Sequence, residues 1–125
     1  MESPGGLRDH YDNPRNLGDL DDADAVAIVH NPVCGDMLRL AVRCEGGTIT
    51  KARFKGYGCA AAIAAGSVVA EWIEGTSVAD AASLTDEDIT RVLGPLPPMK
   101  VHAIVLARET VSRVVEQLET EDAVT

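Results

Sequence analysis

The sequence predicts an α+β fold in which helices pack on one face of a small antiparallel sheet. Residues 25–55 hold short apolar or alternating segments typical of strands, and residues 59–119 hold longer segments typical of helices. Because the strands come first and the helices follow, rather than alternating with them, the pattern favours α+β over α/β. The length of 125 residues fits one domain, and we find no internal repeat and no second domain.

The first segment, residues 1–24, is predicted to be a flexible acidic arm. Prolines and glycines interrupt it, and the aspartates of residues 19–24 keep it solvated. The single domain is expected to occupy residues 25–119, and residues 120–125 are expected to form a frayed tail.

Three segments are predicted to form the sheet. Residues 25–30 are a short apolar run that Asn31-Pro32 ends. Residues 37–44 alternate, with one apolar face formed by Leu38, Leu40, Val42 and Cys44. Residues 48–55 alternate again. Because a glycine-containing turn at residues 45–47 joins the last two segments, we expect an antiparallel hairpin.

The helices are predicted from composition and end signals. Residues 59–74 are rich in alanine and contain no proline, and Gly75 suits the end of a helix. A short helical segment is expected over residues 77–82. Thr85 suits an N-cap, with acidic residues after it, and that helix should end at residue 93 before Gly94-Pro95. The last helix is expected over residues 99–119, with Pro98 in its first turn.

The charge and the apolar pattern exclude several classes of function. The net charge of −9 makes the chain a poor ligand for nucleic acid or anionic membranes, since both are bound through Lys and Arg. No apolar run approaches the ~20 residues that span a bilayer. The N-terminal residues lack the features of a secretory signal or a transit peptide, so we expect a cytoplasmic protein. Disulfides are then unlikely among its three cysteines.

The three cysteines differ in their surroundings. Cys44 shares the apolar face of its strand, where a small buried side chain fits, and is predicted to be structural. Cys34 lies in a loop that no apolar pattern explains. Cys59 lies where a glycine-flanked loop becomes a helix, and a helix N-terminus favours a thiolate. Two isolated cysteines are nevertheless more often structural than metal-binding.

Two further residues strengthen a metal-site interpretation. Asp36 follows Cys34 closely enough for Gly35 to bring both side chains to one ion. His102 falls in the first turn of the last helix, although a helical histidine is more often a surface or core residue. Together, Cys34, Asp36, Cys59 and His102 would offer two thiolates, a carboxylate and an imidazole, a set that suits tetrahedral zinc or iron in a cluster.

Four segments resemble, in the same order, those of the IscU/NifU N-terminal-type iron–sulfur cluster scaffolds. The similarity covers about residues 9–119 and rests on Tyr11-Asp12-Asn13-Pro14-Arg15-Asn16-Leu17-Gly18, Pro32-Val33-Cys34-Gly35-Asp36, Ala52-Arg53-Phe54-Lys55-Gly56-Tyr57-Gly58-Cys59 and Leu96-Pro97-Pro98-Met99-Lys100-Val101-His102. The ordered series is more specific than any one of these motifs.

The resemblance implies a scaffold or carrier rather than an enzyme. Such proteins receive sulfur as a persulfide from a PLP-dependent cysteine desulfurase and electrons from a ferredoxin, build a [2Fe–2S] cluster, and pass it to recipient apo-proteins. As isolated they also hold zinc. By residue match, the implied iron or zinc ligands are Cys34, Asp36, Cys59 and His102. The segment implied to bind an Hsp70-type chaperone comprises Leu96, Pro97, Pro98, Met99 and Lys100.

The sequence departs from the family pattern at Ala103. The resemblance implies a third cysteine immediately after His102, acting as persulfide acceptor and ligand, and alanine does neither. Three interpretations stay open: a scaffold whose sulfur arrives on Cys34 or Cys59, a zinc-binding or regulatory relative that binds the desulfurase or chaperone without building clusters, and a degenerate site on a fold that serves interaction only.

Overall fold

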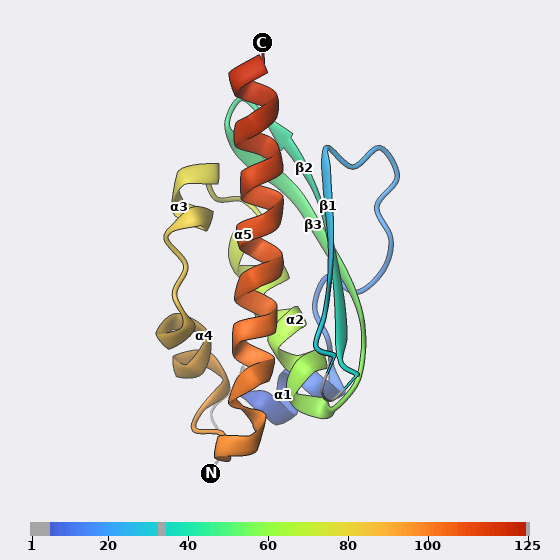
Figure 1. Ribbon diagram of the computed structural model, residues 1–125, viewed down its shortest axis with the longest axis vertical. Coiled ribbons are helices and arrows are strands. Elements are labelled where there is room, and N and C mark those ends of the chain that lie inside the picture. Colours follow the sequence, from blue (N-terminus) through green and yellow to red (C-terminus); the bar gives the residue numbers. More distant parts are fainter. Residues whose placement is uncertain (1–5, 33–34, 125) are drawn as a thin grey trace.

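The computed structural model describes residues 6–32 and 35–124. Its sheet contains β1 (Ala25–His30), β2 (Met37–Glu45) and β3 (Thr48–Tyr57), antiparallel in the order β1-β2-β3. Helices α2 (Ala60–Ile73) and α5 (Val101–Val124) pack against one face of this sheet, as Figure 1 shows. The predicted α+β fold is therefore confirmed, and the predicted strands lie within two residues of those observed.

Alternation along the strands produces the buried face of the sheet. Leu40 is paired with Ala27 on one side and with Phe54 on the other, and all three are buried. The register shifts between Arg43 and Cys44, which pairs Cys44 with Ile49. As a result, Cys44 is only partly buried, although it packs against the core as the strand pattern predicts.

The close approach of α2 to the sheet depends on a glycine. A Cβ atom added at Gly66 would lie 2.7 Å from the ring of Phe54, so α2 and β3 can pack at this distance only without a side chain there. Beyond α2 come α3 (Val78–Ala82) and α4 (Asp86–Leu93). Thr85 caps α4 in a reciprocal capping box with Asp88, which confirms the predicted N-cap.

The prediction of a flexible N-terminal arm is wrong for most of residues 6–24, the part of the arm that the structure describes. Residues Leu7–Asp12 form helix α1, which packs on α2. His10 is 1% exposed, and its Nδ1 lies 2.7 Å from Ser67 Oγ in α2, which also accepts a hydrogen bond of 2.8 Å from the Arg15 amide. A six-residue helix is too short to show periodicity, and its anchor is polar, so the apolar pattern could not predict it.

The chain after α1 also docks on the sheet. The Gly18 amide donates to the carbonyl of Phe54, and the Phe54 amide donates to the carbonyl of Asn16, so residues 16–18 run beside β3. Asp19 then crosses to the face away from the helices, where it pairs with Arg39 at 3.0 Å and Lys55 at 2.8 Å.

The C-terminal helix is longer than predicted. The short 3₁₀ helix η1 (Pro98–Lys100) leads into α5, which continues to Val124 rather than ending near residue 119. No glycine or proline occurs within α5, and nothing therefore stops it. None of the helices in the described ranges is long and apolar enough to cross a membrane.

We predict that His10 makes stability depend on pH. Burial lowers the pKa of His10 below its ordinary 6.5 and the nearby Arg15 lowers it further, while Glu71 and Asp9 act in the opposite direction. The unfolded chain then binds the proton more readily, so this contribution is present above pH 6.5 and is lost as the pH falls through the folded-state pKa.

Urea unfolding of the parent chain and of His10→Gln, from about pH 8 to about pH 5, measures this dependence. The slope of unfolding free energy against pH just below 6.5 should be shallower in the variant. Equal slopes would contradict the assignment.

Candidate metal centre

The site begins with Asp36, at the end of the loop that joins β1 to β2. This loop is closed by two hydrogen bonds, from the Asn31 amide to the Asp36 carbonyl (2.7 Å) and from the Gly35 amide to the Asn31 carbonyl (2.8 Å). Asp36 is only 3% exposed. A buried carboxylate must be paired, and it therefore organises the groups around it.

Cys59 is the first partner of Asp36. It is the N-cap residue of α2, and its amide donates to Asp36 Oδ1 at 3.2 Å, while its Sγ lies 3.6 Å from Oδ2. Gly58 makes this approach possible. A Cβ atom there would lie 2.1 Å from Asp36 Oδ1, and the φ of +136° is itself rare for other residues.

His102 is the second partner. It is the second residue of α5, and its Nε2 lies 3.2 Å from Asp36 Oδ2. Its side chain is 33% exposed, against 4% for that of Asp36. The carboxylate therefore joins the start of β2, the start of α2 and the start of α5 at one end of the molecule.

Three of the four predicted ligands thus lie together, while Cys34 lies outside the described residues. Within residues 6–32 and 35–124, no group of three or more His, Cys, Asp or Glu side chains is arranged to hold a metal ion as it stands. Asp36 instead contacts both other donors directly, so a metal would have to replace these contacts. The donor set itself, with thiolate, imidazole and carboxylate, fits zinc or iron.

Ala103 lies against this cluster. It is fully buried in a small group with Ala61 and Ala62, and Cys59 and Leu96 pack against that group. The position where the resemblance implies a third thiol therefore belongs to the same packed group that Cys59 contacts, on the side of α5 that faces the start of α2.

The predicted chaperone segment ends at Lys100, two residues before His102. Pro97 and Pro98 are exposed, Leu96 and Lys100 are partly exposed, and Met99 belongs to η1, with its side chain outside the description. The η1 turn leads directly into α5 and thereby positions His102.

Two residues of the site are not predicted from the sequence. Gly58 is expected only as part of the glycine-flanked loop before Cys59, whereas it leaves room for the Asp36 carboxylate. Asn31 is expected only to end the first strand, whereas its main-chain groups close the loop that holds Asp36. A glycine before Cys59 is a signal for close approach, but no pattern in the sequence indicates which group approaches.

The fold and the site define a class: small α+β proteins that collect Cys, Asp and His side chains at one end of a three-stranded sheet. The chain belongs to the family of the NifU-like N-terminal domain, whose model matches residues 5–124.

Individual relatives agree with this assignment. The chain is 42% identical over 107 residues to the iron–sulfur cluster assembly scaffold protein IscU of Escherichia coli K12, covering 82% of this chain and 83% of that protein. It is 38% identical over 107 residues to scaffold protein IscU 1 of Archaeoglobus fulgidus, covering 86% and 70%. The crystal structure of a NifU-like protein (N-terminal) from Brucella abortus has the same fold, with a TM-score of 0.73, 24% identity and 92% coverage of each chain.

We predict that Gly58→Ala disrupts the site. The new methyl group would displace the Asp36 carboxylate and should lower the free energy of unfolding by about 1–3 kcal/mol. Gly18→Ala is the matched control, because Gly18 has nearly the same φ, +139° against +136°, and no atom within 4 Å of an added Cβ.

Urea unfolding measures both variants, and the resonances of the His102 ring report on the site. Gly58→Ala should cost more than Gly18→Ala and should shift those resonances. Equal costs with an unchanged His102 spectrum would show that the contact with Asp36 is unimportant.

Proposed function

We propose that this protein is an iron–sulfur cluster assembly scaffold. It binds iron and sulfide as a [2Fe–2S] cluster, its cargo, and passes the cluster to recipient apo-proteins. The proposed ligands are Cys34, Asp36, Cys59 and His102, and zinc is the alternative occupant of the same donors. The relatives at about 40% identity are named as scaffolds, which supports a carrier rather than an enzyme.

A single observation carries the proposal: one buried carboxylate contacts both a cysteine and a histidine from distant segments. Asp36 lies 23 residues from Cys59 and 66 residues from His102 in the sequence. All three side chains are metal ligands by type, and Cys34 belongs to the same loop as Asp36. A purely structural role would not require this combination of donors.

The proposed partners follow from the role. A cysteine desulfurase supplies sulfur as a persulfide, a ferredoxin supplies the electrons that reduce it to sulfide, and an Hsp70-type chaperone binds residues 96–100. We place this work in the cytoplasm. The exposed Pro97 and Pro98 support the chaperone segment, because a rigid exposed loop is accessible to a partner.

Ala103 limits which cysteine can receive the sulfur. Without a thiol at this position, the persulfide sulfur must be received by Cys34 or Cys59. The alternative is a zinc-binding relative that binds the same partners without building clusters, and the names of the relatives do not favour it.

The first test is metal and acid-labile sulfide analysis after anaerobic reconstitution with ferrous iron, a desulfurase and cysteine. We expect equal amounts of iron and sulfide, with visible absorption that chelators bleach. Ala103→Cys, made in parallel, serves as the comparison. Zinc or no metal in the parent, with iron and sulfide only in Ala103→Cys, would overturn the scaffold proposal in favour of the alternative.

A second test compares two cysteine variants. Cys59→Ala should abolish metal retention, because it removes a proposed ligand. Cys44→Ala should keep the metal and lose about 1 kcal/mol of stability, because the Cys44 side chain packs against the core. Metal analysis and thermal unfolding of both variants separate the two roles. Loss of metal on mutating Cys44 instead would refute the ligand assignment.

A further inference from the structure

The free edge of β1 is a second surface of interest. β2 pairs with one side of β1, and no described strand pairs with its other side. The Asn31 amide bonds inward, to the carbonyl of Asp36. Because main-chain groups alternate in an antiparallel ladder, those of Val26, Ile28 and His30 point outward.

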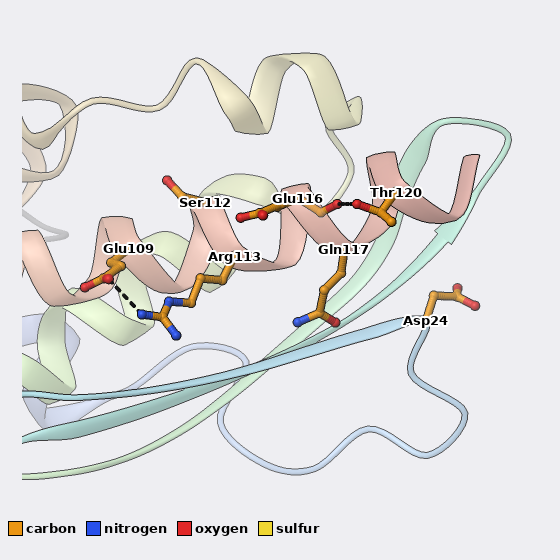
Figure 2. Close-up of a pocket in the computed structure, with 7 residues that line it drawn as sticks. All are labelled: Asp24, Glu109, Ser112, Arg113, Glu116, Gln117 and Thr120. Carbon is orange, nitrogen blue, oxygen red and sulfur yellow. Dashed lines mark hydrogen bonds and ion pairs between the residues drawn. The ribbon is translucent and has the colours of Figure 1, made fainter. Parts of the chain in front are cut away.

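One of these three residues already has a partner that imitates a strand. Gln117, on α5, donates from Nε2 to the carbonyl of Val26 at 2.7 Å and accepts from the Val26 amide at 3.1 Å. Its side-chain amide thus takes the place of a peptide group in a neighbouring strand. Figure 2 shows Gln117 reaching from α5 toward β1. No described side chain does the same for Ile28 or His30, whose side chains are exposed.

The surface of α5 beside the β1 edge is acidic. A groove of about 790 Å³ runs along α5 past Gln117, and its charged residues are Asp24, Glu109 and Glu116 against Arg113 alone (Figure 2). Arg113 is paired with Glu109 at 3.0 Å. Glu109 also lines a second hollow of about 310 Å³, which includes His30 and His102 and so reaches the candidate metal centre.

We propose that the β1 edge binds an extended segment of a partner protein, which adds a strand to the sheet. Main-chain hydrogen bonds to Ile28 and His30 would hold the segment, and it would displace Gln117 to reach Val26. Side chains of a strand alternate between faces. Those toward α5 would be Lys or Arg, facing Glu109 and Glu116, and those between them would be apolar, beside Ile28.

A second copy of this chain is a poorer occupant, because two chains of net charge −9 repel each other. The inference goes beyond the scaffold proposal and does not depend on metal binding. It can therefore be tested on metal-free protein, so that its failure and the failure of the scaffold proposal are distinguishable.

The test titrates ¹⁵N-labelled protein with a capped synthetic peptide in which Lys and Val alternate. We expect the amide resonances of Ile28 and His30 to shift. The control peptide carries Pro in place of each Val, so that it has the same charge but lacks alternate N–H groups. It should bind about tenfold more weakly. Equal binding of both peptides would show attraction by charge alone and would overturn the proposal.

Two variants of the edge give an independent test. Ile28→Pro removes an outward N–H, which an edge strand tolerates because the ladder to β2 does not use it. Ile28→Thr keeps that N–H. The alternating peptide should bind Ile28→Pro about tenfold more weakly than Ile28→Thr. If Ile28→Pro fails to fold, the peptide comparison alone decides.

Equal affinity of two folded variants would overturn the proposal. So would a dimer of the parent chain in sedimentation that Ile28→Pro abolishes, because the edge would then belong to a second copy.

Discussion

The buried carboxylate of Asp36 is the constraint on which the site depends. It accepts a hydrogen bond from the amide of Cys59 and lies within 3.2 Å of His102 Nε2, so one side chain ties the start of β2 to the starts of two helices. Burying a carboxylate is costly unless it is paired, so the partners must be present when the fold forms. Gly58 and Asn31 serve this arrangement, one by leaving space and one by closing the loop.

The rest of the fold holds the starts of β2, α2 and α5 in place. Gly66 lets α2 lie close to Phe54, and the core of small aliphatic side chains then fixes α5 against β1 and β2. The N-terminal residues contribute from outside the core, through the contact of His10 with Ser67 and the pairing of residues 16–18 with β3. The end of the molecule that carries Asp36 and the free edge of β1 are therefore parts of one packed fold, and His102 and His30 line the same hollow between them.

The sequence allowed the α+β class, the hairpin and the Thr85 cap to be predicted, because each rests on a local pattern: alternation, a glycine turn or a capping residue. It also grouped Asp36, Cys59 and His102 as candidate metal ligands, first from their residue types and then from the ordered resemblance, but no local pattern could predict their contacts, which span up to 66 residues. Helix α1 was missed because it is only six residues long and is held by tertiary contacts of Leu7 and His10. The extension of α5 was missed because its helix-forming residues gave no end signal. The role of Ala103 in sulfur transfer stays a prediction.

The most direct test of the account is X-ray absorption at the iron edge of the reconstituted protein, beside His102→Ala. If Asp36, Cys59 and His102 surround the cluster, the parent should show sulfur ligands together with a nitrogen ligand that the variant lacks. An iron environment unchanged by His102→Ala would contradict the account, because His102 would then not be a ligand of the iron.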